Sequence, residues 1–499
     1  MDLFDNLVLG FQICLTWSNL GYCLLGVVIG TLIGVLPGVG PVMTIALLLP
    51  VTFGLAPSSA LIMLAGIYYG AQYGGSTSAI LLNLPGETSS VVTCLDGHQL
   101  ARRGRAGAAL GVAALGSFFG GCAATLLIVL FAPALAAVGL KFGPAEYFSL
   151  MVLGLVAAVV LAHGSLLKAV AMTVLGLLLG LVGMDVNSSF VRFGFGLPEL
   201  SDGLGFVVVA TGLFGFAEIV ANLTARESRS VATSDVHHLW PTRADWRAST
   251  APVLRGTALG SLLGILPGGG AAMASFAAYT LEKRLSRHPE RFGHGAIEGV
   301  AGPETANNAA AQTSFIPLLT LGLPSNPVMA LMVGAMMIHG ITPGPQVATQ
   351  NPDLFWGTIV SMWIGNLMLV VLNLPLIGLW VRLLRVPYRL LYPAILLFGA
   401  IGVYSLNNSV TDLLLAAGFG ALGYLLIRLE CEPAPLLLGL VLGPLMEENL
   451  RRALLLSRGD ATVFLTKPIS LALLLLAVAL LVLVISPAIR RTRDVAFQE

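Results

Sequence analysis

Long runs of apolar residues follow one another along nearly the whole chain, separated by short polar or Pro/Gly interruptions. A helix of about 17–25 apolar residues crosses the hydrocarbon core of a bilayer. The runs lie at about 20–36, 57–84, 106–138, 144–162, 166–183, 203–221, 252–281, 309–338, 354–381, 388–403, 413–427, 434–445 and 468–485. This pattern predicts an all-α integral membrane protein with about 12 membrane segments, some of them broken helices.

One glycine-rich motif occurs twice. Residues 30–43 read GTLIGVLPGVGPVM and residues 260–273 read GSLLGILPGGGAAM, with eight of fourteen positions identical at a constant offset of 230. A Leu-Pro motif follows each copy, as LNLPGE at 82–87 and as LGLPSN at 321–326. Internal similarity of this kind indicates a duplicated architecture.

The duplication suggests a division of the chain. The longest polar interval separates the two apolar halves and reads as a linker. The expected parts are a first membrane repeat (1–225), a polar cytoplasmic linker (226–251), a second membrane repeat (252–446) and a C-terminal part (447–499) with a connecting segment, an extra span and a basic tail.

Basic residues occupy different loops in the two halves. In the first half they follow the Leu-Pro motif, as Arg102, Arg103 and Arg105, whereas in the second they follow the glycine motif, as Lys283, Arg284, Arg287 and Arg291. Basic loops stay on the cytoplasmic side. Equivalent loops therefore lie on opposite sides, which predicts two inverted-topology repeats.

The apolar segments that follow the glycine motifs are too short to span. Residues 42–53 and 271–281 would each form a helix of roughly 17 Å, about half of the hydrocarbon core. We expect two re-entrant hairpins, one from the periplasmic side and one from the cytoplasmic side, whose glycine tips meet near the middle of the bilayer. Irregular backbone at that depth is tolerated where it is buried in protein or lines a watery cavity, so the tips predict a binding site between the repeats.

Main-chain N–H groups at the tips, with a helix start at Pro41, suit an anion. Nearby hydroxyls, amides and unwound carbonyls suit carboxylate oxygens and a sodium ion. The predicted substrate-binding residues are Gly38, Gly40, Pro41, Ser76, Thr77, Ser78, Asn83, Gly86, Gly268, Gly269, Gly270, Asn307, Asn308, Thr313, Ser314 and Ser325. The predicted cation-coupling residues are Asn83, Glu304, Asn308 and Asn326.

Each of these assignments has a simpler interpretation. Glycines also allow helices to pack closely. A hydroxyl in a membrane helix often bonds a carbonyl of its own helix. Glu304 could instead cap a helix start.

Composition narrows the class of protein. Charged residues make up 10% of the chain and hydrophobic residues 56%, against about 25% charged in soluble domains. The net charge of +1, without a long basic run, argues against nucleic-acid binding. The five cysteines are scattered without C-x-x-C spacing and read as small apolar residues, neither disulfides nor metal ligands.

Enzyme signatures are weak. The chain has neither H-E-x-x-H nor G-x-x-x-x-G-K-[ST]. A serine protease built on Ser76 and His339 would rest only on a serine flanked by small residues. We therefore expect no catalytic residue, no metal site and no cofactor other than a coupling cation, and hence secondary transport driven by an ion gradient.

Several long stretches resemble a known family. These are GVLPGVGP, ALIMLAGIYYGAQYGGSTSAILLNLPGE, DGHQLARRGRAGAALG, KRLSRHPERFGHGAIEGVAGPETANNAAAQTSFIPLLTLGLP and IHGITPGP. They resemble the large membrane subunit of tripartite tricarboxylate transporters over almost the whole chain. The family's paired glycine motifs fall on Gly34–Pro41 and Gly264–Gly270, and its PETANN segment on Pro303–Asn308. Ser325-Asn326 stands where the family often has Gly-Ser, which leaves the substrate open.

The resemblance implies a multi-pass, cation-driven importer in the bacterial inner membrane. Its implied partners are membrane lipid, a small four-span membrane subunit and a periplasmic solute-binding protein that delivers an organic carboxylate. The leading hypothesis is the translocation subunit of such a transporter. The alternative is an ion or anion channel with re-entrant hairpins, although inverted repeats within one chain favour alternating access. The carboxylate, the choice of sodium or protons and the oligomeric state stay open.

Overall fold

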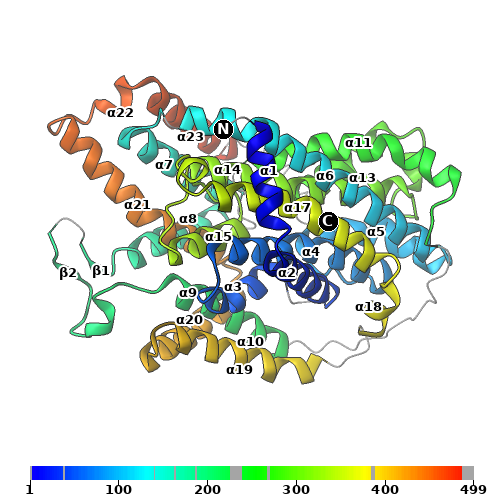
Figure 1. Ribbon diagram of the computed structural model, residues 1–499, viewed down its shortest axis with the longest axis horizontal. Coiled ribbons are helices and arrows are strands. Elements are labelled where there is room, and N and C mark those ends of the chain that lie inside the picture. The colour runs from blue at the N-terminus through cyan, green and yellow to red at the C-terminus, as the bar shows by residue number, and fades with distance from the viewer. Residues whose placement is uncertain are drawn as a thin grey trace.

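A computed structural model describes residues 3–36, 40–139, 141–161, 165–185, 188–224, 239–266, 270–383 and 388–485. These residues are overwhelmingly helical (Figure 1). In the described chain one short antiparallel sheet interrupts the helices, with Gly183 opposite Arg192 and Met184 opposite Val191. The expectation of an all-α protein is confirmed apart from this hairpin, which projects from one end of the molecule (left in Figure 1).

The elements before the linker are α1 (Leu3–Cys14), α2 (Trp17–Val35), α3 (Pro41–Thr52), α4 (Pro57–Leu82), η1 (Thr88–Ser90), α5 (Val91–Arg102), α6 (Ala106–Gly139), α7 (Pro144–Leu161), α8 (Leu166–Leu179), β1 (Gly183–Met184), β2 (Val191–Arg192), η2 (Pro198–Leu200), α9 (Phe206–Ala210), the π-helical turn η3 (Thr211–Phe216) and α10 (Ala217–Thr224).

The elements after it are α11 (Arg243–Ile265), α12 (Gly270–Leu285), η4 (Pro289–Arg291), α13 (Glu298–Thr313), α14 (Phe315–Leu321), α15 (Pro327–Ile338), α16 (Val347–Gln350), α17 (Pro352–Asn373), α18 (Ile377–Leu383), α19 (Tyr388–Asn407), α20 (Val410–Arg428), α21 (Ala434–Leu456), α22 (Val463–Thr466) and α23 (Pro468–Ile485).

Four helices of the described chain are long and apolar enough to cross a membrane. They comprise Trp17–Val35, Ala106–Phe131, Pro352–Asn373 and Val410–Arg428. Further apolar helices, among them α3 and α15, have 10–17 residues and are shorter than a typical span. The helices thus indicate a multi-pass membrane protein, while the number of about 12 segments stays a prediction.

The segments after the two glycine motifs differ in length. Helix α3 has 12 residues, as expected. Helix α12 has 16 residues and continues beyond the predicted end at residue 281, because its polar last turns are anchored. Glu282 is buried and accepts hydrogen bonds from Arg255 on α11 at 2.7 and 2.5 Å.

The glycine motifs pack helices in the same way in both halves. A Cβ added to Gly26, Gly30 or Gly34 on α2 would lie 2.2–2.4 Å from a carbonyl oxygen of α4, the acceptors being Met63, Ile67 and Ala71. A Cβ added to Gly256, Gly260 or Gly264 on α11 would lie 2.2–2.5 Å from carbonyl oxygens of α13, those of Gly302, Ala306 and Ala310. Only glycine permits such contact between helix backbones.

This packing relates α4 to α13–α14 by a constant offset of 239 residues, while α2 and α11 keep the offset of 230. The following breaks obey the same rule. Asn83 ends α4 with φ 57° and Gly322 ends α14 with φ 73°, both left-handed C-caps before a Leu-Pro pair. The two halves therefore repeat one local arrangement, whereas their inverted orientation and the domain boundaries stay predictions.

Helix α13 is the centre of the molecule. Every residue from Gly299 to Thr313 is buried, and the helix packs against α4, α5 and α6 of the first half as well as α11 and α12 of its own half. On the side of the basic loops, Arg105 at the start of α6 forms a 2.5 Å ion pair with Asp245 in the first turn of α11. The two halves are thus joined both at their centre and at this edge.

Candidate functional site

Glu304 on α13 is the most deeply buried acidic group at the centre. Its side chain is fully buried, and its two oxygens accept hydrogen bonds from Ser76 on α4 and Thr93 on α5. The contact joins a carboxyl group of the second half to two hydroxyls of the first. Because Glu304 lies in the second turn of α13 and bonds side chains of other helices, its role is not that of a helix cap.

Glu87 is a second carboxyl group near the same centre. It precedes η1 as the N-cap and forms a capping box with Ser90. Ser89 lies within hydrogen-bond distance of both the Glu87 carboxyl and, at 2.8 Å, Oε1 of Gln72 on α4. A hydroxyl donates only one proton. All three groups are satisfied together when Glu87 carries a proton that it donates to Ser89.

Neither carboxyl group has a basic partner. Among the described residues, no Lys, Arg or His forms an ion pair with Glu87 or Glu304. An ionised carboxylate buried without a partner is very costly, so such a group takes up a proton or binds a cation. The centre of the molecule is therefore suited to hold one positive charge that the chain itself does not supply.

Helix α13 also presents amides without partners. Asn307 has neither its Nδ2 nor its Oδ1 in a hydrogen bond, although both atoms are buried. The same is true of both polar atoms of Gln312 and of Oδ1 of Asn308. Buried polar groups in proteins are nearly always hydrogen-bonded, and exceptions call for an explanation such as a ligand or a water.

A small cavity adjoins Glu304. It has a volume of about 10 Å³ and is lined by Tyr73, Ser76, Thr77, Leu110, Ala113, Ala114, Ser117 and Asn373. This volume is close to that of a single water probe, about 10–15 Å³. Ser76 lies between this cavity and Glu304, because it lines the first and donates to the second. The polar wall accommodates one water or one small cation, but no carboxylate.

The second Leu-Pro break contributes Asn326. Its Oδ1 accepts a hydrogen bond from the backbone N–H of Met329 at 3.0 Å and so caps α15, as a good N-cap residue does. Its Nδ2 donates to the hydroxyls of Tyr68 on α4 at 3.3 Å and of Ser314 at 3.2 Å. Asn326 thus connects the second break to the first half.

The helix start predicted at Pro41 is confirmed. Gly40 is the N-cap of α3 and Pro41 occupies the first helical position, without a side chain that caps the first N–H groups. A Cβ at Gly40 would meet nothing within 4 Å, so open space lies beside it. Gly270, at the start of α12, has φ +51° and lies close to Asn326. Gly38, Gly268 and Gly269 lie outside the described residues, so the meeting of the two tips stays a prediction.

The remaining predicted residues divide into two groups. Ser76, Thr77, Asn307 and Asn308 gather around Glu304 and the cavity, and Nδ2 of Asn308 donates to Ser117 at 2.7 Å. The others make local contacts. Thr313 and Ser314 bond carbonyls of their own helix, Ser78 bonds the Gly34 and Gly75 carbonyls, Ser325 bonds the Ser314 carbonyl, Gly86 packs against Gly34, and Asn83 is an exposed C-cap.

Sequence reasoning missed several residues of this centre. Gln72, Tyr73, Thr93 and Ser117 all take part in it or line its cavity. Gln72 lies one helical turn before Ser76, so the polar face of α4 could have revealed it. Thr93 and Ser117 lie alone among apolar neighbours and give no comparable signal.

Outside the apolar region, Asp245 is electrostatically tuned. Burial raises the pKa of its carboxyl group, but hydrogen bonds from Arg105 and Thr242 outweigh burial and hold that pKa below the ordinary value. Thr242 also accepts from the Asp245 backbone N–H at 3.2 Å, which completes a capping box at the start of α11.

Comparison with known proteins gives a consistent picture. A family model described as the tripartite tricarboxylate transporter TctA family matches residues 20–438. A protein of Agrobacterium vitis described as an uncharacterized 52.8 kDa protein in the TAR-I ttuC' 3' region is 62% identical over 499 residues, which is 100% of this chain and 99% of that protein. An uncharacterized protein in the TAR-II ttuC' 3' region of the same organism is 65% identical over 240 residues, 48% of this chain and 99% of that protein. No solved structure matches.

Proposed function

This chain belongs to the tripartite tricarboxylate transporter TctA family, and from that membership we propose that it is the translocation subunit of a cation-coupled secondary transporter importing a tricarboxylate or a related organic carboxylate. The proposal includes dependence on a periplasmic solute-binding protein, a small four-span membrane subunit as partner, and a place in the bacterial inner membrane. The observation that carries it is the Glu304 centre, a buried carboxyl group of one half enclosed by hydroxyls of the other without a basic partner.

The coupling cation is assigned to this centre. Glu304 and its neighbour Glu87 supply negative charge, while Ser76, Thr77 and Ser117 supply oxygen atoms around a cavity of about 10 Å³. Oxygen ligands suit sodium, and a carboxyl group with hydroxyl partners suits a proton. Occupancy by either cation removes the cost of the buried charge.

The carboxylate is assigned to the space between the two helix starts and α13. The first N–H groups of α3 lack a side-chain cap, and open space lies beside Gly40. A helix N-terminus attracts anions. The unpartnered amides of Asn307 and Gln312 offer further donors once the halves move apart, because amide groups bond carboxylate oxygens well.

Coupling then follows from charge. An anion brought near Glu304 and Glu87 is repelled unless a cation has first neutralised them. The cation therefore favours substrate binding, and the substrate favours cation binding by the same factor. Movement of the loaded pair from one side to the other gives alternating access between the repeats.

Uptake into reconstituted vesicles tests the proposal. The chain is reconstituted with its two partner proteins, and uptake of labelled citrate, succinate and malate is measured with sodium and proton gradients imposed separately. Accumulation against the substrate gradient with one of the two cation gradients is the expected result. Flux that saturates with none of these anions and never exceeds equilibrium would instead favour the channel.

A matched pair of variants assigns the flux to the centre. Glu304→Gln keeps the shape of the side chain and removes its charge, whereas Glu199→Gln makes the same change at an exposed position on η2. Accumulation is expected to disappear in the first variant and to persist in the second. Full accumulation in Glu304→Gln would show that the cation binds elsewhere.

A further inference from the structure

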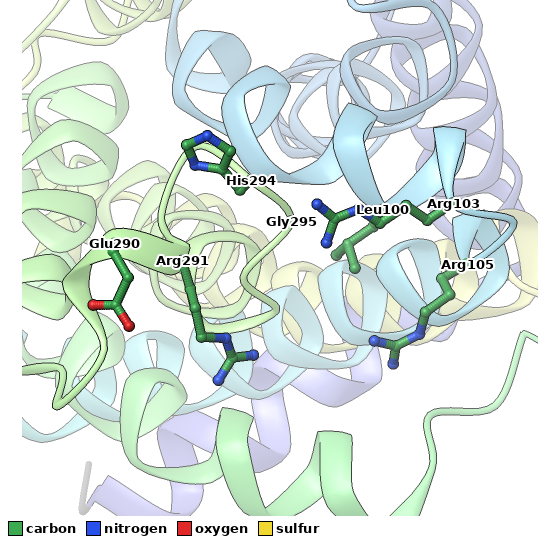
Figure 2. Close-up of a pocket in the computed structure, with 7 residues that line it drawn as sticks. All are labelled: Leu100, Arg103, Arg105, Glu290, Arg291, His294 and Gly295. Carbon is green, nitrogen blue, oxygen red and sulfur yellow. The ribbon is translucent and has the colours of Figure 1, made fainter.

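A second cavity lies on the face that carries the basic loops. It has a volume of about 330 Å³ and is lined by Leu100, Arg103, Arg105, Glu290, Arg291, His294 and Gly295. Figure 2 shows arginine side chains extending toward a common space from two sides, Arg103 and Arg105 from the end of α5 and the start of α6, and Arg291 from the connection between α12 and α13. The cavity is therefore formed jointly by the first and the second half.

The wall of this cavity is held rigidly. Oδ1 of Asp96 on α5, a fully buried residue, accepts hydrogen bonds from the backbone N–H groups of Gly295 at 2.7 Å and Ala296 at 2.8 Å. Its Oδ2 accepts from the hydroxyl of Tyr279 at 3.0 Å. Gly295 has φ +94°, and a Cβ there would lie 3.4 Å from Nη1 of Arg103. The connection is thus fixed against α5 at the point where Arg103 emerges.

The charges of the cavity are only partly compensated. Arg105 is paired with Asp245 at 2.5 Å, and Arg291 lies 3.8 Å from Glu298. Glu290, the acidic residue among those that line the cavity, is paired with His288 at 3.2 Å. Within the described ranges, no carboxylate forms an ion pair with Arg103. The cavity therefore has one unpaired guanidinium and two that neighbouring carboxylates hold in place.

These features match the chemistry of anion recognition. A guanidinium presents N–H groups in a planar fork that fits carboxylate and phosphate oxygens, and fixed guanidinium groups lose little freedom on binding. The volume of about 330 Å³ is within the usual range for small-ligand sites, about 300–1,000 Å³. A ligand with two or more acidic groups can reach guanidiniums on both sides at once.

We propose that this cavity is a second binding site, separate from the Glu304 centre, for a small multivalent anion of the carboxylate or phosphate class. Its position suggests a role that rests on the proposed function. Arg103 follows Thr93 by ten residues along α5, about 15 Å at the rise of an α-helix, and Thr93 contacts Glu304. The cavity is then the site at which an imported carboxylate is held on the cytoplasmic side after it leaves the centre.

Direct binding measurements test the site. The full chain is placed in nanodiscs of phosphatidylcholine, and citrate and inorganic phosphate are each titrated by calorimetry. The test variant is Arg103→Gln/Arg291→Gln. The control is Arg102→Gln/Arg287→Gln, which removes the same charge from the same two segments at exposed positions that do not line the cavity.

Binding in the test variant is expected to be at least about tenfold weaker than in the wild type, because each substitution removes a charge-assisted hydrogen bond. The control is expected to change by less than about twofold. Equal weakening in both variants would overturn the proposal, since it would reduce the effect to general surface charge. Absence of citrate and phosphate binding to the wild type would overturn it as well.

Two further arms separate the possible ligands and the two proposals. Titration in nanodiscs that contain phosphatidylglycerol shows whether a lipid headgroup occupies the cavity, because citrate binding would then be lost, which would overturn the release role. Glu304→Gln is expected to keep the binding that Arg103→Gln/Arg291→Gln removes. Normal substrate release by the cavity variant in a transporting system would overturn the release role alone. Absence of transport with intact binding would instead remove the proposed function.

Discussion

The hydroxyl of Tyr68 on α4 accepts a hydrogen bond from Asn326 at 3.3 Å, across the boundary between the two halves. The offset of 239 residues makes Asn307 the counterpart of Tyr68, and Glu87 the counterpart of Asn326. One pair is closed by a hydrogen bond, whereas in the other the amide of Asn307 has no partner. The repeats thus differ at equivalent positions, and the half with the carboxyl group is the one with unused hydrogen-bonding capacity.

From this difference we predict that anion and cation bind interdependently. The centre holds carboxyl groups without a basic partner, so a bound cation lowers the repulsion that an anion meets. The affinity for citrate should rise with sodium or with protons, and the cation affinity should rise by the same factor with citrate. Titration of citrate binding against sodium at fixed pH, and against pH without sodium, measures this effect. An affinity that responds to neither would contradict it.

Glu304→Gln should separate coupling from binding. The amide keeps the size of the side chain and can still accept hydrogen bonds from Ser76 or Thr93, but it takes up no proton and attracts a cation only weakly. Gradient-driven accumulation should fall at least about tenfold, while exchange of labelled for unlabelled substrate at equal concentrations persists. Loss of both activities in a folded variant would assign Glu304 to substrate binding.

Gly34→Ala should destabilise the protein strongly. The new Cβ would lie 2.2 Å from the carbonyl oxygen of Ala71, so α2 and α4 must move apart. Overpacking of this kind costs about 1–3 kcal/mol. Gly21→Ala is the control, because a Cβ there meets nothing within 4 Å. Thermal unfolding in detergent compares the two, and equal melting temperatures would show that the contact relaxes freely.

Gly40→Leu should abolish transport without preventing folding. Gly40 has φ −81° and open space beside it, so the leucine fits the fold but covers the first N–H groups of α3. Uptake should fall at least about tenfold with normal amounts of protein in the membrane.

Gly270→Leu should abolish transport as well, but with a loss of stability, because its φ of +51° strains a residue with a Cβ by about 1–2 kcal/mol. Gly270→Asn tolerates this backbone better and separates strain from blocking. Normal uptake by Gly40→Leu would leave the first motif with a packing role alone.

Acid should weaken the junction between α6 and α11. The pKa of Asp245 in the folded protein is below its ordinary value, so its contribution to stability is present above the unfolded pKa of about 3.9 and is lost as pH falls through the folded pKa. Thermal unfolding from pH 6 to pH 3 should show the wild type approaching Asp245→Asn below about pH 4. A constant difference between the two proteins over this range would contradict the assignment.

The sequence predicted the parts of this protein that depend on local pattern. The repeated glycine frame predicted equivalent packing, which the carbonyls above Gly34 and Gly264 bear out, and Pro41 predicted the start of α3. The position of Glu304 could not be predicted in the same way. Its partners Ser76 and Thr93 are more than 200 residues away along the chain, and pairing over that distance is decided by how α4, α5 and α13 pack. The hairpin β1–β2 was missed for a related reason, since its two strands have two residues each.

The ion pair between Arg105 and Asp245 restricts the path of the chain in a way that needs no hydropathy scale. Two groups 2.5 Å apart lie on the same side of any membrane. The chain that leaves Arg105 along α6 and reaches Asp245 must therefore complete an even number of crossings on the way. One crossing each by α6, α7, α8 and the continuous stretch α9–η3–α10 meets this condition. In that arrangement the parity is odd at β1–β2, so the hairpin faces the compartment opposite to the one that contains Arg103 and Arg291.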